Sequence, residues 1–278
     1  MTPLDRRSFL ALSAMLPYAY TARAANAKIP VGLELYSVRE ELKKDPEATV
    51  RAVGEMGYEC VEFYAPYFER TNEQTKDMRK LLDNLGVRCF STHNDLNYLD
   101  PDKINRTQDL NLTLGSKYVV VASAQPNAGP DGWKPVADAL NAAAEKLEPA
   151  GLKVGYHNHE PEFRQVDGKY PAQYLAEHTN PSVVLQLDVG TCVASGADPV
   201  AWIRSHPGRI KSMHCKDWSP TQGYKVLFGE GAAPWKEIFT AAENRGGLEY
   251  YLLEQEGSRY SELETAKRCL AAFRSTHT

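Results

Sequence analysis

The sequence predicts a single α/β domain folded as a (β/α)8 TIM barrel, and three observations lead to this prediction. Short β-branched or apolar runs alternate eight times with longer amphipathic runs. Glycine, proline and aspartate mark the boundaries between these runs, as expected of parallel strands joined by helices. The eight units follow one another without a linker, and residues 28–278 have the usual size of one barrel domain.

Taken in chain order, each strand is expected to be followed by a helix. The expected strands are Val31–Tyr36, Cys60–Tyr64, Val87–Thr92, Tyr118–Ala122, Lys153–His157, Val183–Asp188, Ile210–His214 and Tyr250–Glu254. The expected helices are Pro46–Met56, Asn72–Leu85, Lys103–Leu114, Lys134–Ala150, Pro171–His178, Pro199–Ser205, Trp235–Asn244 and Ser261–Phe273.

The boundary residues agree with this order. Glycine ends several helices just before the next strand, at Gly57, Gly86, Gly115, Gly151 and Gly246-Gly247. Proline begins others, in Asp45-Pro46, Asp198-Pro199 and Ala233-Pro234. The alternative is an open doubly wound sheet, which should carry a glycine-rich phosphate loop after its first strand. The segment found there, Ser37-Val38-Arg39-Glu40, contains no glycine.

Residues 1–27 read as a signal peptide of the twin-arginine type. Arg6 and Arg7 precede a short apolar stretch from Phe9 to Ala19, and small residues follow in two A-x-A patterns. The apolar stretch is shorter than the roughly 20 residues that span a bilayer. We therefore expect a periplasmic protein without a membrane anchor after cleavage; the alternative for this segment is an amphipathic helix.

Charge and cysteine content exclude some classes of protein. The formal net charge is -4, and removing Asp5, Arg6, Arg7 and Arg23 with the first 27 residues makes it -6. The basic residues are scattered, so no nucleic-acid partner is expected. The five cysteines form no C-x-x-C pair and are expected to be buried thiols.

Polar residues gather at the carboxyl ends of the predicted strands, where barrel enzymes place their chemistry. Adjacent strands lie about 4.8 Å apart, so side chains at the ends of four successive strands can converge. We predict one divalent metal ion held by His157, Asp188, His214 and Glu254. Two imidazoles and two carboxylates without a thiolate suit Mn, Co, Fe, Zn or Mg, with Mn expected first.

The chain resembles the sugar phosphate isomerase/epimerase family of xylose-isomerase-like barrels over essentially all of residues 28–278. The resemblance is carried by the runs Gly32–Arg39, Gly57–Phe63, Gly155–Phe163, Leu187–Gly190, Gly208–Asp217, Gly229–Gly231 and Tyr251–Glu256. It implies a metal held at the ends of strands five to eight, commonly by Glu, Asp, His and Glu. Asp188, His214 and Glu254 match the last three of these ligands.

The first ligand departs from the family pattern, because His157 stands where the family has Glu. Either His157 binds the metal, or a nearby group such as Glu162 replaces the carboxylate. The run His157-Asn158-His159 resembles inosose dehydratases and enzymes that act on 3-keto-glycosides, and this resemblance implies an acid/base role for His159.

Isomerisation, epimerisation and elimination of sugars share the loss of a proton from a carbon beside a carbonyl, which a bound metal assists as Lewis acid and template. His159 is the expected base because imidazole titrates near neutrality, and Glu162 is the second choice. Lys216 either neutralises a developing oxyanion or is a solvated lysine. Glu62, His93 and Glu256 are expected to bind substrate hydroxyls.

The predicted function is therefore metal-dependent enolisation of a sugar, keto-sugar or cyclitol, by an isomerase, an epimerase, a dehydratase or a keto-glycoside lyase. Two alternatives stay open. A metal-dependent hydrolase on the same barrel is disfavoured by the acidic charge, and a non-catalytic periplasmic sugar-binding protein is compatible with the change at His157. The residues distinguish neither among these reactions nor between a monomer and a homo-oligomer.

Overall fold

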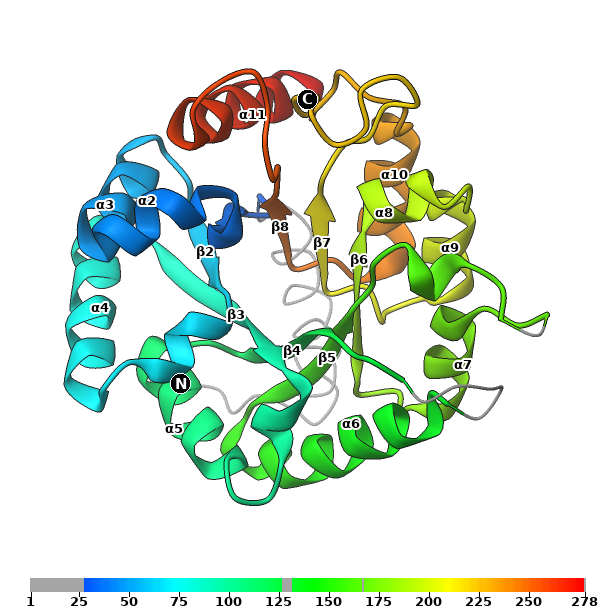
Figure 1. Ribbon diagram of the computed structural model, residues 1–278, viewed down its shortest axis with the longest axis horizontal. Coiled ribbons are helices and arrows are strands. Elements are labelled where there is room, and N and C mark those ends of the chain that lie inside the picture. Colours follow the sequence, from blue (N-terminus) through cyan, green and yellow to red (C-terminus); the bar gives the residue numbers. More distant parts are fainter. Residues whose placement is uncertain (1–27, 127–131, 167, 278) are drawn as a thin grey trace, which may run out of the picture.

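The strands form one closed parallel barrel in chain order, and the helices surround it as an outer ring (Figure 1). The computed structural model describes residues 28–126, 132–166 and 168–277. The predicted signal peptide lies outside these residues. The strands are β1 (Val31–Glu34), β2 (Cys60–Phe63), β3 (Arg88–Asp95), β4 (Tyr118–Ser123), β5 (Lys153–His157), β6 (Val184–Asp188), β7 (Ser212–Cys215) and β8 (Tyr250–Leu253).

Each strand is connected to the next through at least one helix. The α-helices are α2 (Arg39–Lys44), α3 (Pro46–Glu55), α4 (Asn72–Leu85), α5 (Ile104–Leu114), α6 (Lys134–Leu147), α7 (Pro171–His178), α8 (Val189–Ala194), α9 (Pro199–Ser205), α10 (Trp235–Ala241) and α11 (Glu262–Thr276). Five short 3-10 helices are η1 (Leu35–Val38), η2 (Ala65–Glu69), η3 (Leu96–Leu99), η4 (Glu148–Ala150) and η5 (Pro161–Phe163), and a short π-helix, η6 (Ala242–Gly246), follows α10. The (β/α)8 prediction is confirmed.

Helix boundaries follow from local hydrogen bonding. Before α4, the Thr71 hydroxyl accepts from the Gln74 backbone N–H, and the Gln74 side chain accepts from the Thr71 backbone N–H. This reciprocal pair satisfies donors that a helix start leaves free. The helix ends at Gly86, whose φ of 66° lies in the left-handed region that glycine adopts without strain.

Short helices at the carboxyl edge of the barrel were not predicted. After β1, η1 takes up Leu35 and Tyr36, which were expected to end the strand, and α2 follows in a segment expected to be a loop. The helix α8 follows directly on Asp188. Each is six residues or shorter, so its amphipathic period is too brief to recognise. In α2, ion pairs of 2.8 Å and 2.9 Å join Lys43 to Glu40 and Lys44 to Glu41 on the exposed face.

The apolar core lies on both sides of the barrel wall. The larger part packs between the strands and the helices, while a small cluster fills the barrel interior: Cys60, Tyr118, Val120, Val184, Tyr250 and Leu252. Gly32 belongs to this crowded interior, since a Cβ there would lie 2.5 Å from the Cys60 sulfur. All five cysteines are buried and free, as predicted. Within the described ranges, no helix is long and apolar enough to cross a membrane.

The strand register continues above this cluster into a layer of polar side chains. Glu34 of β1 pairs with Glu62 of β2, and His157 of β5 pairs with Gln186 of β6. Successive residues of a strand point to opposite faces, so residues two apart in one strand share the interior. The barrel therefore has an apolar floor and, towards the carboxyl ends of its strands, a buried polar interior.

Candidate metal centre

Four side chains from four neighbouring strand ends converge in the barrel. His157, Asp188, His214 and Glu254 each offer one ligand atom, and these four atoms lie within 4.8 Å of one another. Asp188 and His214 are 0 % exposed, and the other two are at most 7 % exposed. The structure thus brings together all four residues that the sequence analysis assigned to the metal.

The amide of Gln186 fixes the protonation of His157. Gln186 donates its N–H groups to a Glu62 oxygen at 3.0 Å and to the Ser212 hydroxyl at 3.0 Å. A carboxylate only accepts, so the Gln186 oxygen must face the other way, towards Nδ1 of His157 at 3.0 Å. Nδ1 of His157 therefore carries the proton, and Nε2 presents a lone pair.

That lone pair faces a second acceptor. Nε2 of His157 lies 3.7 Å from Oδ2 of Asp188, and this oxygen is buried without a hydrogen-bond partner among the described residues. Ligand atoms lie about 2.0–2.2 Å from a zinc-like ion, so two ligands of one ion are up to roughly 4.2 Å apart. The spacing and the unsatisfied oxygen fit a divalent cation between the two groups.

His214 lies between two carboxylates. Its Nδ1 is 2.6 Å from Glu254 and its Nε2 is 2.8 Å from Glu62. Burial lowers the pKa of His214, but hydrogen bonds to Glu254 and Glu62 outweigh it and raise that pKa to about 10. A ligating histidine commonly donates its other N–H to a carboxylate, and Glu62 is placed for that role.

Lys216 provides positive charge beside the same carboxylates. Its ammonium lies 3.7 Å from Asp188 and 3.6 Å from Glu254, and it also pairs with Glu256. Burial lowers the pKa of Lys216, but the attraction of Glu254, Asp188 and Glu256 outweighs it and raises that pKa. The side chain is 2 % exposed, so Lys216 is not a solvated lysine.

The two other residues predicted to be catalytic, His159 and Glu162, differ in their position relative to the four predicted metal ligands. The His159 ring is half-buried, 4.8 Å from the His157 ring between centroids. Glu162 turns away: its carboxylate accepts from the Tyr156 hydroxyl at 2.8 Å and from the His159 backbone N–H at 2.8 Å. Glu162 therefore does not join the ligand cluster, and His157 occupies the position for which Glu162 was the alternative.

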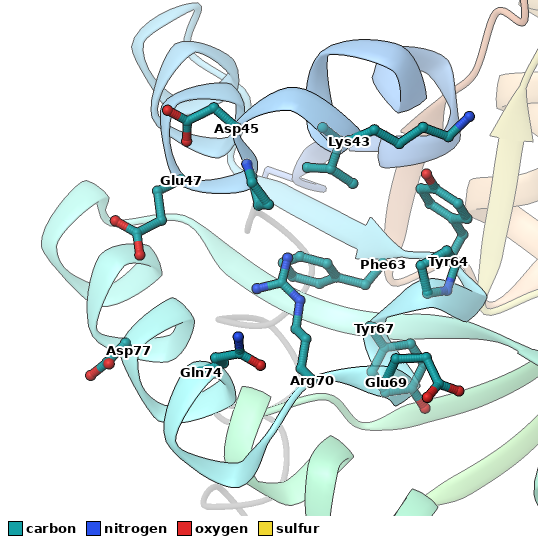
Figure 2. A pocket seen from close by; sticks show the side chains of 13 residues that line it. Lys43, Asp45, Glu47, Phe63, Tyr64, Tyr67, Glu69, Arg70, Gln74 and Asp77 are labelled. Carbon is teal, nitrogen blue, oxygen red and sulfur yellow. The ribbon is translucent and has the colours of Figure 1, made fainter.

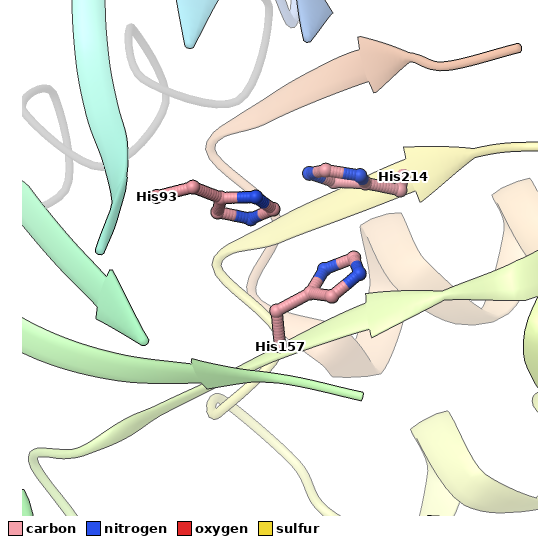
Figure 3. Close-up of side chains that lie close together, drawn as sticks. All are labelled: His93, His157 and His214. Atoms are coloured by element: carbon pink, nitrogen blue, oxygen red, sulfur yellow. The ribbon is translucent and has the colours of Figure 1, made fainter. Parts of the chain in front are cut away.

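A third histidine completes the inner side of the site. Figure 3 shows the rings of His93, His157 and His214 converging from β3, β5 and β7. The His93 centroid lies 4.7 Å from that of His157 and 5.0 Å from that of His214. Burial lowers the pKa of His93 and of His157, so both rings are neutral near pH 7.

Two acidic residues lie beside these rings, and Glu34 was not predicted. Glu62 is 3.1 Å from Nε2 of His93, and Glu34 is 4.0 Å from Nδ1 of the same ring. Burial and repulsion by Glu62 and Glu254 raise the pKa of Glu34 well above its usual value. Burial raises the pKa of Glu62, but the attraction of His93 and the hydrogen bond to His214 outweigh it and lower that pKa to about 2.

The loops above the site are joined to one another. The Tyr224 hydroxyl, in the loop after β7, donates to Glu160 in the loop after β5 at 2.7 Å. The buried Asp217 carboxylate organises the first of these loops, accepting from the backbone of Gly229 at 2.9 Å and of Gly231 at 3.1 Å. These bonds place Tyr224 over the Lys216 ammonium, with 4.9 Å from nitrogen to ring centroid.

A separate cavity of about 540 Å³ lies outside the barrel wall, between α2, α3, η2 and α4 (Figure 2). Arg70 crosses it beside the Phe63 ring, with 5.6 Å from guanidinium carbon to ring centroid. Asp45, Glu47 and Gln74 also line it. None of the residues predicted to bind metal or substrate lines this cavity, so it is distinct from the metal centre.

Sequence reasoning missed Glu34 and Gln186, although each is a polar residue inside an otherwise apolar strand. Gln186 precedes Asp188 by two residues and therefore shares its face of β6. Glu34 holds the equivalent place at the end of β1. The period of two within each strand was the available signal.

Solved structures of other proteins share this fold. A sugar phosphate isomerase/epimerase from Parabacteroides distasonis superposes with a TM-score of 0.76 at 25% identity, covering 90% of this chain and 95% of that one. The solved structure of the IOLI protein, which has a bound zinc atom, superposes with a TM-score of 0.71 at 17% identity, covering 90% and 99%.

Among curated proteins, an inosose dehydratase from Clostridium tetani is 27% identical over 200 residues, or 64% of this chain and 66% of that protein. An inosose dehydratase from Clostridium beijerinckii is 36% identical over 86 residues, or 31% of this chain and 28% of that protein. The chain thus spans less than two thirds of the length of these relatives. The model of the xylose isomerase-like TIM barrel family matches residues 50–276. The chain belongs to the xylose isomerase-like TIM barrel family.

Proposed function

We propose that the protein is a metal-dependent enzyme that removes a proton from the carbon beside a carbonyl group of a keto-sugar or cyclitol ketone. Within this class we favour dehydration, in which a hydroxyl group leaves the next carbon. The observation that carries the proposal is the convergence of His157, Asp188, His214 and Glu254 in the barrel. The names of the curated relatives, inosose dehydratases, support the choice of dehydration.

The four converging residues would hold the metal. When bound, a divalent ion in such a site supplies Lewis-acid polarisation of substrate oxygens and a template for them. Manganese is our first choice from the ligand set, and zinc is the alternative that the bound zinc of the IOLI protein suggests. Gln186 and Glu62 hold the imidazoles of His157 and His214 in the orientation that ligation needs.

His159 takes the proton in this proposal. Its ring is half-buried and beside His157, so it can reach a substrate above the ligand cluster. The bond from its backbone N–H to Glu162 fixes the turn that carries it. In dehydration the C–H electron pair forms the new C=C bond, the C–O bond breaks, and the departing hydroxyl receives a proton to leave as water.

Lys216 and the inner residues orient the substrate. The Lys216 ammonium is held next to Asp188 and Glu254, where it stabilises negative charge that develops on the substrate oxygen. His93 is 7 % exposed at the inner side of the cluster, and Glu256 is exposed and paired with Lys216. We assign hydroxyl binding to Glu256, while His93 and Glu62 bound the inner side of the substrate space.

The test is solvent proton exchange. Metal-stripped protein is reloaded separately with Mn²⁺, Zn²⁺ or Mg²⁺ and incubated in heavy water with ketoses, cyclitol ketones and 3-keto-glycosides. Each sugar is then freed of metal and analysed by NMR. We expect deuterium beside the carbonyl of one substrate class, loss of that exchange on chelation, and an unsaturated product if water is eliminated.

Variants separate the roles of these residues. His159→Gln should keep its metal content and lose exchange, whereas Asp188→Asn should lose metal and exchange together. His178→Gln is the matched control, because His178 is exposed on α7 and stacks on Tyr174 with ring centroids 3.9 Å apart. Metal binding without exchange into any substrate would refute the enzymatic proposal and favour a sugar-binding protein.

We also propose export by the twin-arginine route to the periplasm, based on the motif at Arg6 and Arg7. A reporter fused after residue 27 should reach the periplasm, and Arg6→Lys together with Arg7→Lys should retain it in the cytoplasm. Equal export of both fusions would refute this route.

A further inference from the structure

We propose that Glu34, Glu62 and His93 form a second divalent-cation site on the inner side of the first, so that the protein binds two metal ions. These side chains come from β1, β2 and β3, and the closed barrel sets β1 next to β8, the strand that Glu254 follows. One ligand atom from each of the three lies within 4.8 Å of the others.

The first argument is the hydrogen bonding of His93. Its Nε2 lies 2.6 Å from the Gln186 oxygen, and that oxygen only accepts, so Nε2 carries the proton. Nδ1 of His93 then presents a lone pair, and it faces Oε1 of Glu34 at 4.0 Å. That distance is too long for a hydrogen bond. Two ligands of one ion are up to roughly 4.2 Å apart, so the gap suits a bound cation.

The second argument is an unsatisfied atom. Glu34 is 0 % exposed, and its Oε2 has no hydrogen-bond partner among the described residues. Its Oε1 accepts one weak bond, from the Tyr36 backbone N–H at 3.3 Å. Leaving a buried carboxylate oxygen unpaired is costly. A cation bound by both oxygens of Glu34 would satisfy Oε2, which the described residues leave unpaired, and would fill the gap between Oε1 and His93.

The third argument is the charge of the interior. Four carboxylates are buried there, from Glu34, Glu62, Asp188 and Glu254. The Lys216 ammonium lies beside Asp188 and Glu254, and the His214 ring lies between Glu254 and Glu62. Ions buried away from water need partners of opposite charge. One divalent ion at the first centre serves Asp188 and Glu254, and it leaves Glu34 and Glu62 side by side at the ends of β1 and β2.

Glu62 would link the two ions. Its Oε2 lies 3.1 Å from Nε2 of His93 and 2.8 Å from Nε2 of His214, so one carboxylate touches a ligand of each centre. Each carboxylate oxygen has lone pairs beyond those used by these contacts. The metal class is one that accepts mixed imidazole and carboxylate ligands, such as Mn²⁺, Co²⁺ or Zn²⁺.

The experiment counts metal ions and does not depend on turnover. The full chain is stripped with chelator, reloaded with Mn²⁺, desalted and measured by plasma mass spectrometry. We expect two ions per wild-type chain, one in Glu34→Gln and one in Asp188→Asn. Glu55→Gln, at an exposed glutamate ending α3, should keep both. The electron paramagnetic resonance spectrum should show coupled Mn²⁺ ions in wild type and an isolated ion in Glu34→Gln.

If wild type and Glu34→Gln each bind one ion, the proposal is overturned. A proton shared by Glu34 and Glu62 would then explain how the two carboxyl groups are buried together. Two ions in wild type and two in Glu34→Gln would overturn the assignment of Glu34. If Glu34→Gln does not fold, as judged by circular dichroism, His93→Gln takes its place. The count is separate from the proposed function: one ion with proton exchange refutes only the second site, whereas two ions without exchange refute only the enzymatic activity.

Discussion

Replacing Gln186 with methionine should weaken metal binding without removing any ligand. Gln186 accepts from His157 at 3.0 Å and from His93 at 2.6 Å, and it donates to Glu62 and Ser212 at 3.0 Å each. Methionine matches its size and forms none of these bonds. His157 would lose the partner that keeps its proton on Nδ1, and its Nε2 lone pair would no longer be held towards Asp188.

The expected loss of metal affinity follows from the number of metal ligands that Gln186 orients. Loss of a hydrogen bond that orients a metal ligand typically costs about 10- to 100-fold in affinity. Gln186 contacts His157 directly and reaches His214 through Glu62, which is 2.8 Å from Nε2 of His214. Because both imidazole ligands depend on Gln186, we expect the upper part of this range. A tenfold change in affinity corresponds to about 1.4 kcal/mol, so the loss of binding free energy should be about 2–3 kcal/mol.

The assay is a competition between metal-free protein and a chromophoric chelator for Zn²⁺. Thermal unfolding of the metal-free variant is measured in parallel, because buried groups left unpaired cost about 1–3 kcal/mol each. Gln173→Met is the matched control, since Gln173 is exposed on α7 and bonds Glu177. Equal zinc affinity in wild type and Gln186→Met, with both folded, would refute the reasoning.

Three further predictions concern charge and packing. Metal must displace a proton from His214, because the pKa of His214 is raised to about 10 in the metal-free protein. The metal affinity should therefore rise about tenfold per pH unit between about pH 6 and about pH 8. A flat profile of affinity against pH in titration calorimetry would contradict this. Lys216→Met removes an ammonium next to two proposed ligands, so it should tighten Mn²⁺ binding about tenfold or more, while proton exchange into the substrate falls. Weaker Mn²⁺ binding by the same calorimetry would show that the ammonium does not oppose the cation. Gly231→Ala places a Cβ 2.0 Å from an Asp217 oxygen, which should cost about 1–3 kcal/mol of overpacking. The melting temperature should therefore fall by several degrees in differential scanning calorimetry, while that of Gly257→Ala, with open space around it, should change little. Equal melting temperatures would contradict the close packing.

The sequence predicts the barrel because its signals are local and repeated. Apolar runs of strand length, helix periods and terminating glycines such as Gly86 each report on their own segment, and eight concordant units determine the topology. The strand ends are also correct within about two residues for most strands, which places His157, Asp188 and His214 at one edge. The short helices α2 and α8 fall below the length at which a helical period is visible.

The parts of the site that sequence reasoning missed depend on contacts across the barrel. Gln186 acts through partners on β2, β3, β5 and β7, and no local pattern reveals such a set. Glu162 was expected near the metal because it is five residues from His157. The chain after β5 instead turns Glu162 towards the Tyr156 hydroxyl, on the outer face of the barrel wall.

The hydrogen bond between Tyr224 and Glu160 has a consequence for engineering by loop exchange. The loop after β5 carries His159 next to Glu160, and the loop after β7 carries Tyr224, so this bond couples the position of the proposed base to the second loop. Grafting either loop alone from a relative would break this bond, leaving the Tyr224 hydroxyl or Oε1 of Glu160 without this partner. The two loops therefore form one transferable module, and variants of substrate preference are best built by exchanging both together.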